Sequence, residues 1–168
     1  LDQDIQAELF TLTHTLLGGA GYEGYEVSNF AIGPGHRSRH NQKYWHHVPY
    51  MGLGVSAHSF DGRRRWWNRR TLDDWHRAVE AGQLPRAESE TLDDRSLALE
   101  ALMLGLRTRE GIDLERVTAR FEHDLLKAAA GPLERLEARG LASLSGGRLS
   151  LTLAGRAIAE SIAVELAP

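Results

Sequence analysis

Histidines gather between residues 36 and 58, where five of the eight in the chain fall within 23 residues. Imidazole can ligate a metal ion, and it titrates near neutral pH. The same stretch contains tyrosine and tryptophan rings, arginine and lysine side chains, and a glycine-rich turn around Gly52 and Gly54. Metal ligands, flat rings and cations together favour a planar, anionic ligand with a metal at its centre. A porphyrin is therefore the leading candidate ligand.

The spacing of these histidines also allows less specific interpretations. His36 and His40 lie four residues apart, which on a helix would put both on one face. A glycine and a serine beside them argue against a firm helix, and no glutamate accompanies the pair as in a zinc protease motif. His46 and His47 precede a valine and a proline in a predicted loop. Paired histidines in such a loop are more often solvated than ligating.

Charge is distributed unevenly along the chain. Residues 36–70 carry eight arginine and lysine side chains and one acid, whereas the whole chain has a formal net charge of -3. All four tryptophans lie in or just after this basic segment. A basic, aromatic strip suits a flat anionic partner, either a porphyrin carboxylate or a nucleic acid, and a solvated arginine–tryptophan hairpin is the alternative. DNA binding is not expected, because the candidate recognition helix over residues 133–140 has no net charge.

Composition excludes several classes of protein. The chain has 168 residues and no cysteine, which excludes disulfides, thiolate zinc sites and a cysteine-held iron–sulfur cluster on this polypeptide. No apolar run approaches the ~18 residues of a membrane span, and no signal peptide opens the chain, so we expect a cytoplasmic protein. The chain begins at Leu1 and enters a helical pattern directly, so we expect an excised piece of a longer protein.

The first part of the chain predicts one unit of an α/β barrel. Apolar spacing predicts a helix over residues 4–17, and a short strand is predicted over residues 25–30. In barrels of this kind, ligands lie at the carboxyl ends of the strands. Glycines in residues 51–60 indicate a bend or a close backbone approach to a ligand, and Asp61-Gly62 indicates a hairpin turn.

From residue 71 onward the pattern changes to helices. Thr71 and Thr91 each precede an acid by three residues, so both are predicted N-caps. A hairpin is predicted over residues 141–152, followed by a last helix that begins at Thr152. Three helices, a two-stranded wing and a closing helix are typical of a winged-helix-like domain. The predicted fold class is therefore α/β (α+β), with a partial barrel edge over residues 1–70 and a winged-helix-like domain over residues 71–168.

Several motifs occur in a specific order along the chain. They are Tyr25-Glu-Val-Ser-Asn-Phe-Ala31, Pro34-Gly-His36, Arg39-His-Asn-Gln-Lys-Tyr-Trp45 and Tyr50-Met-Gly-Leu-Gly-Val-Ser-Ala-His-Ser59. Together they resemble the radical S-adenosylmethionine family of oxygen-independent coproporphyrinogen III oxidase-like proteins. The string from His40 to Trp45, His-Asn-x-x-Tyr-Trp, is similar to the motif that distinguishes the HemW-like heme chaperone branch. Residues 107–156 resemble the family's C-terminal domain, so the resemblance covers essentially the whole chain.

The resemblance implies cofactors that this chain cannot hold by itself. The family's radical chemistry depends on three cysteines that bind a [4Fe–4S] cluster, which cleaves S-adenosylmethionine, and this chain has no cysteine. The main S-adenosylmethionine-binding strands also lie upstream in the family. The resemblance therefore implies the C-terminal part of such a protein, without radical chemistry of its own.

The resemblance also implies a heme site. His40 is the first candidate for axial ligand of the heme iron, with His36 and His58 as weaker options alongside His46 and His47. Tyr44 and Trp45 would flank the macrocycle, and Asn41 belongs to the same motif. Arg37, Arg39 or Lys43 could pair with the propionates. The residues implied to bind the cofactor are His40, Asn41, Tyr44, Trp45, His36, Arg39 and His58, with His40 on the metal.

The implied function of the parent is to bind heme in the cytoplasm and to deliver it to acceptor proteins, with possible peripheral membrane association. Two alternatives stay open. The parent could decarboxylate coproporphyrinogen III, or the arginine–tryptophan hairpin could belong to a protein or nucleic-acid interaction module. The opening helix and strand would lack their barrel neighbours, so self-association of this piece is a further expectation.

Overall fold

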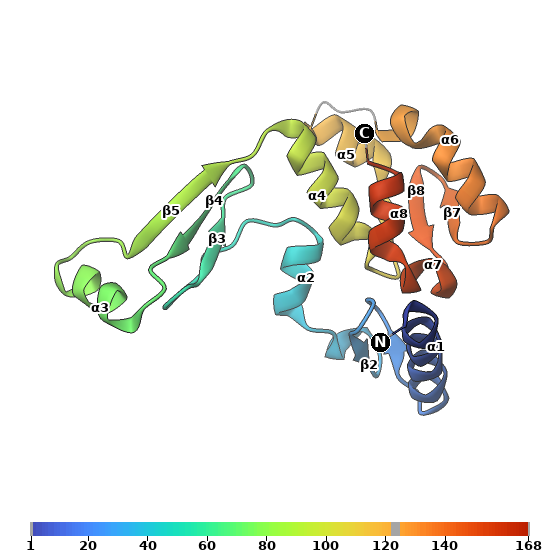
Figure 1. Ribbon diagram of the computed structural model, residues 1–168, viewed down its shortest axis with the longest axis horizontal. Coiled ribbons are helices and arrows are strands. Elements are labelled where there is room, and N and C mark those ends of the chain that lie inside the picture. The colour runs from blue at the N-terminus through green and yellow to red at the C-terminus, as the bar shows by residue number, and fades with distance from the viewer. Residues whose placement is uncertain (1, 122–124, 168) are drawn as a thin grey trace.

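The computed structural model describes residues 2–121 and 125–167, and Figure 1 shows its elements in chain order. The helices are α1 (Gln3–Gly19), the 3-10 helix η1 (Pro34–His36), α2 (Arg39–Trp45), α3 (Leu72–Glu80), α4 (Asp94–Leu106), α5 (Leu114–Phe121), α6 (Leu125–Ala138), α7 (Leu153–Ala157) and α8 (Ala159–Glu165). The strands are β1 (Glu23–Gly24), β2 (Phe30–Ala31), β3 (His58–Phe60), β4 (Arg64–Asn68), β5 (Arg86–Thr91), β6 (Ile112–Asp113), β7 (Ala142–Ser145) and β8 (Arg148–Leu151). The predicted mixed class of helices and strands is confirmed.

The described strands form three small antiparallel sheets, in the orders β1-β2, β3-β4-β5 and β6-β8-β7. The predicted turn at Asp61-Gly62 joins β3 to β4, and the predicted hairpin at residues 141–152 is the β7–β8 pair. β5 was not predicted. It pairs with β4 along residues 64–68, so the sheet continues past residue 70, where we placed the domain boundary. That boundary, the barrel edge and the winged-helix-like class remain predictions.

The hydrophobic core lies almost entirely in the C-terminal part of the chain. α4 contributes Leu97, Leu102 and Leu106, each at most 1% exposed. The buried positions of α4 follow the helical period and are Leu97, Ala98, Ala101, Leu102, Gly105 and Leu106. Leu149 from β8 and Ile162 from α8 pack in the same cluster. Figure 1 shows α4, α5, α6 and α8 gathered around the β6-β8-β7 sheet. The rest of the chain is attached to this unit, which contains most of the hydrophobic core.

Gly111 is required for the close approach of β6 to β8. Its φ is +69°, and a Cβ at this position would lie 2.0 Å from the carbonyl oxygen of Leu149. Glycine adopts such a conformation without a steric penalty. Gly52 has a similar role at the other sheet, because a Cβ there would lie 2.1 Å from the carbonyl oxygen of His58. The close approach at Gly52 is therefore to the chain's own backbone, and the approach to a ligand expected from the glycines of residues 51–60 remains a prediction.

The β3-β4-β5 sheet projects as an arm away from the C-terminal unit, with α3 at its far end (Figure 1). α3 begins as predicted, because the Thr71 hydroxyl accepts a hydrogen bond from the Asp74 amide at 3.2 Å. The predicted N-cap at Thr91 is wrong. Thr91 ends β5, and the carboxylate of Asp93 caps α4 by accepting from the amide of Ser96 at 2.7 Å.

The N-terminal part differs from the predicted helix–strand unit. α1 forms, but the predicted strand over residues 25–30 is wrong for residues 25–29, which turn the chain between β1 and β2, and only Phe30 lies in a strand. The turn is stabilised locally. The Glu26 carboxylate accepts from the Ser28 amide at 2.9 Å and from the Asn29 side-chain nitrogen at 2.7 Å, which competes with an extended strand.

One face of α1 is not covered in this chain. Ile5, Leu9, Leu12 and Leu16, the predicted apolar stripe, are 46–64% exposed. α1 packs instead against β1 and α7. Within residues 2–121 and 125–167, no helix is both long and apolar enough to span a bilayer.

Candidate functional site

α2 carries the His-Asn-x-x-Tyr-Trp motif, and this helix was not predicted from the sequence. Ser38 caps it, because its hydroxyl accepts a hydrogen bond from the Asn41 amide at 3.2 Å. The Ser38 amide in turn donates to the hydroxyl of the buried Tyr25 at 3.0 Å. The chain leaves the helix at His46, whose amide still donates to a helix carbonyl. The expectation that no single helix joins His36 to His40 is confirmed, since His36 ends η1 and α2 begins at Arg39.

His40 and Tyr44 lie together on one face of α2, where His40 is exposed and Tyr44 is half-buried. They are four residues apart on the helix, which places them one turn apart on the same face. Their rings pack edge to face with centroids 5.0 Å apart, and the Tyr44 hydroxyl lies 2.9 Å from His40 Nε2. A metal at Nε2 would displace this hydroxyl, whereas Nδ1 of His40 has no hydrogen-bond partner among the described residues.

Asn41 and Trp45 anchor α2 to the turn before it. The side-chain nitrogen of Asn41 donates to the Asn29 side-chain oxygen at 3.2 Å. The Trp45 ring packs edge to face on Tyr25, with centroids 5.8 Å apart. Both residues are half-buried. Their side chains hold the helix in place, so in this motif His40 is exposed while Asn41 and Trp45 anchor the helix.

The other predicted site residues lie on separate elements. His36 sits at the end of η1 with its Nδ1 2.6 Å from the carbonyl oxygen of Ile32. His58 lies in β3 and stacks on Trp67 with centroids 5.7 Å apart. Arg39 is exposed at the start of α2. Among the described residues, no hydrogen bond or ring contact joins His36 or His58 to His40, so the structure does not gather the predicted imidazoles into one cluster.

A metal site built by several side chains is not present in the described part of the chain. Residues 2–121 and 125–167 contain no group of three or more histidine, aspartate or glutamate side chains that could hold an ion. A heme iron needs only one or two protein ligands, because the macrocycle supplies four nitrogens. A single exposed imidazole such as His40 therefore stays compatible with heme binding.

His47 is buried, which the sequence did not indicate. The paired histidines were interpreted as solvated, and this holds for His46 but not for His47, which is 6% exposed. Its Nε2 donates to the Glu100 carboxylate at 3.4 Å, and its ring packs on Phe60 with centroids 4.6 Å apart. Its φ of +53° is unusual for a residue with a side chain. Glu100 is 53 residues away in sequence, so no local pattern could have indicated this burial.

Glu100 connects α4 to both the histidine turn and the arm. The hydrogen bond from His47 and the charge of Arg65 lower the pKa of Glu100 below its usual range, against the effect of burial. Arg65 of β4 also pairs with Glu90 of β5. Tyr50 packs close to this group, and burial raises the pKa of its phenol. The network fixes α2, the arm and the C-terminal unit relative to one another.

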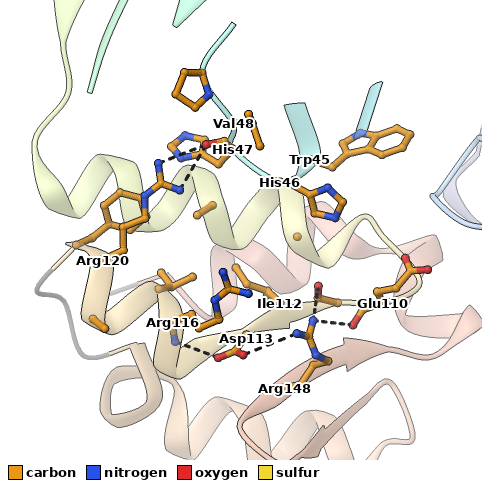
Figure 2. A pocket seen from close by; sticks show the side chains of 17 residues that line it. Trp45, His46, His47, Val48, Glu110, Ile112, Asp113, Arg116, Arg120 and Arg148 are labelled. Atoms are coloured by element: carbon orange, nitrogen blue, oxygen red, sulfur yellow. Dashed lines mark hydrogen bonds and ion pairs between the residues drawn. The ribbon is translucent and has the colours of Figure 1, made fainter. Parts of the chain in front are cut away.

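Two cavities border the histidine turn. The larger one, of about 810 Å³, opens between residues 45–49 and a wall made by α4, α5, β6 and β8 (Figure 2). Trp45 and His46 lie on one side, and three arginines, Arg116, Arg120 and Arg148, reach it from the other. A smaller cavity of about 330 Å³ lies between α2, β3 and α4 and includes Tyr44. His40 lines neither cavity.

Known proteins match this chain along nearly its whole length. The family model described as the HemN C-terminal domain matches residues 92–158. A protein of Mycobacterium tuberculosis named heme chaperone HemW is 34% identical over 161 residues, which are 96% of this chain and 39% of that protein. A mouse protein named radical S-adenosyl methionine domain-containing protein 1, mitochondrial, is 32% identical over 99% of this chain and 40% of its own length.

A solved structure shares the fold. The structure described as coproporphyrinogen III oxidase (HemN) from Escherichia coli, a radical SAM enzyme, superimposes with a TM-score of 0.62 over 94% of this chain and 39% of the other. The sequence identity of 14% means that this likeness shows the fold alone.

The chain belongs to the family of coproporphyrinogen III oxidase-like radical SAM proteins and corresponds to their C-terminal part. Within that family it is HemW-like, since heme chaperones HemW of several bacteria match it. It spans about two fifths of the length of the Mycobacterium tuberculosis and mouse relatives. The cysteine-held cluster of the family does not fit the residues present here, because the chain offers no thiolate.

Proposed function

We propose that this chain is the heme-binding C-terminal part of a heme chaperone and that His40 is the axial ligand of the heme iron. The observation that carries the proposal is the exposed His40 beside the half-buried Tyr44 on α2, within the motif that resembles the chaperone branch. His40 faces solvent while Asn41 and Trp45 hold the helix. A ligand can therefore reach the imidazole without disturbing the contacts that position it.

The chemistry around His40 suits a heme that is held and then released. Neutral imidazole binds iron, and the Tyr44 ring beside it offers an apolar edge to a macrocycle. The exposed guanidinium of Arg39, one residue before His40, is available to a propionate. His36 and His58, which lie on other elements, are weaker candidates. An exposed, single-ligand site supports a carrier that passes heme to an acceptor protein more than a permanent cofactor site.

The wider role is proposed for the parent protein. It binds heme in the cytoplasm, delivers it to acceptor proteins and associates with the membrane surface only peripherally. A [4Fe–4S] cluster and S-adenosylmethionine belong to the remainder of that protein. The names of the relatives, heme chaperone and radical S-adenosyl methionine domain-containing protein, support this assignment.

A hemin titration followed by absorbance tests the proposal. We expect the chain to bind hemin with a shifted Soret band, and His40→Ala to weaken binding and change the band, because the iron loses its imidazole. His76→Ala is the matched control, since His76 is also an exposed helical histidine and lies on α3 at the far end of the arm. An unchanged spectrum and affinity in His40→Ala would remove His40 from the site.

The fold likeness to coproporphyrinogen III oxidase keeps a second function in view, the decarboxylation of coproporphyrinogen III by the parent. Assay of the full-length, cluster-reconstituted parent separates the two. Turnover of coproporphyrinogen would favour the oxidase function. Heme transfer without turnover would favour the chaperone function. The interaction-module alternative has less support, because Arg63 pairs with Asp94 and Arg65 with Glu90, which neutralises part of the arginine hairpin.

A further inference from the structure

The larger cavity contains two guanidinium groups that no carboxylate of the described residues neutralises. Arg116 and Arg120 are four residues apart on α5, so both project from one face of the helix. Figure 2 shows both side chains on the cavity wall. Val117 and Phe121 fix α5 in the core beside them, which sets the direction of this face.

The acids near this cavity are already paired with other cations. Asp113 pairs with Arg148 at 3.7 Å, and it also accepts a hydrogen bond from the backbone amide of Arg116 at 3.0 Å. Glu110 pairs with Arg37, which lies outside the cavity. Within residues 2–121 and 125–167, no carboxylate forms an ion pair with the Arg116 or Arg120 side chain.

The two arginines differ in how firmly they are held. Arg120 donates from both terminal nitrogens to the carbonyl oxygen of His47, at 3.4 Å each, and lies over the Phe121 ring. The guanidinium of Arg116 has no partner among the described residues. Across the cavity, the exposed imidazole of His46 points toward them and likewise has no hydrogen-bond partner in the described part of the chain (Figure 2).

We propose that this cavity binds the carboxylate-bearing edge of a porphyrin, with Arg116 and Arg120 as receptors for its propionates and His46 as a further donor. Guanidinium groups recognise carboxylates through paired hydrogen bonds, which are stronger where the site excludes water. The cavity volume of about 810 Å³ lies in the range typical of small-molecule sites. Trp45 at the rim supplies a flat apolar surface for the ring system.

The inference rests on the proposed function, because heme is the porphyrin expected, but it concerns different residues. His40 is outside the cavity, whereas Trp45 and His46 follow it on the same segment. The segment would therefore offer an iron ligand on α2 and a carboxylate site just beyond the helix. The two can be tested separately with a porphyrin that has no iron.

The test measures the affinity of metal-free protoporphyrin IX and of its dimethyl ester by quenching of tryptophan fluorescence. We expect Arg116→Gln and Arg120→Gln each to weaken binding of the diacid about tenfold, the loss of one charge-assisted hydrogen bond. Binding of the ester, which has no carboxylate, should stay the same. The double variant Arg70→Gln/Arg139→Gln is the control, because it removes two exposed arginines that lie outside the cavity.

Arg116→Gln is the decisive single variant, because the Arg116 guanidinium makes no contact that the fold needs. Circular dichroism verifies that Arg116→Gln and Arg120→Gln are folded. Equal affinity of the diacid for Arg116→Gln and the control would overturn the inference. A His40-dependent hemin spectrum would then still support the proposed function. Conversely, diacid binding could depend on the arginines while the hemin spectrum of His40→Ala stays unchanged. That result would support the carboxylate site in the cavity and reject His40 as the iron ligand. Failure of the wild-type chain to bind either compound would reject both.

Discussion

The C-terminal unit, residues 92–166, and the histidine-rich segment, residues 36–58, are built in opposite ways. The C-terminal unit supplies nearly all of the fully buried side chains, among them Leu97, Leu136 and Leu149. In the histidine-rich segment, His47 is the one residue that the structure describes as fully buried. The segment is held instead by a helix cap, ring contacts and a few long-range polar bonds.

Under the proposed function, the residues that stabilise the fold are therefore different from the residues that bind the ligand. A packed unit resists change because each buried side chain has many neighbours. A segment that rests on that unit can expose imidazole, tyrosine and arginine side chains to a ligand at little cost to the fold. Glu100 and His47 form the main contact between the C-terminal unit and the histidine-rich segment. This contact fixes the position of the candidate site relative to the core.

The largest expected effect is a cavity in the packed unit. Leu102→Ala should lower the free energy of unfolding by about 2–5 kcal/mol, because Leu102 is 1% exposed and lies in the main core cluster. The same change at Leu12, which is 51% exposed on α1, should cost less than about 0.5 kcal/mol. Urea unfolding of both variants measures the contrast. Similar losses at the two positions would show that α1 is packed in solution.

A smaller effect is expected where the two regions meet. Glu100→Gln should destabilise the chain by about 2 kcal/mol at pH 7, because a charged partner of His47 and Arg65 is lost. Since the pKa of Glu100 is lowered in the folded state, its carboxylate stabilises the fold above the unfolded pKa of about 4.3. This contribution disappears as the pH falls through the lower folded value.

Urea unfolding at several pH values checks that sign. The difference between wild type and Glu100→Gln should be largest near neutral pH and shrink in acid. A difference that grows as the pH falls would contradict the assigned direction.

The smallest effect compares two helix caps. Thr152→Ala should cost about 1 kcal/mol of global stability, because its hydroxyl accepts from the Gly155 amide beside the core. Thr71→Ala removes the equivalent bond from α3, at the end of the arm. It should speed amide exchange in α3 with less change in the unfolding midpoint, since local openings there need not involve the core. Equal shifts of the midpoint would show that the arm unfolds together with the C-terminal unit.

The parts of the fold that follow from local pattern could be predicted from the sequence. α1, the β3–β4 turn, the β7–β8 hairpin and the cap at Thr71 depend on near neighbours in the chain. β5 could not be predicted, because its residues are mostly charged or polar and its strand exists only by pairing with β4. The turn at residues 25–29 depends on the Glu26 carboxylate, which overrides a strand-like sequence.

The candidate site was also predicted only in part, because some of its residues depend on partners that are distant in the sequence. His40 and Tyr44 lie together because they are one helical turn apart, a relation the motif already contains. The burial of His47 depends on Glu100, 53 residues away, and the contact of Arg120 with His47 spans 73 residues, so both lie beyond any local pattern. The separation of His36 and His58 from His40 likewise follows from the positions of η1 and β3.

The most direct test of the account is electron paramagnetic resonance of the ferric heme complex of this chain, with wild type, His40→Ala and His76→Ala compared at equal loading. The account predicts an imidazole-ligated iron signal in wild type and His76→Ala, and its loss in His40→Ala. The same ligation signal in all three proteins would contradict the assignment of His40 as the iron ligand.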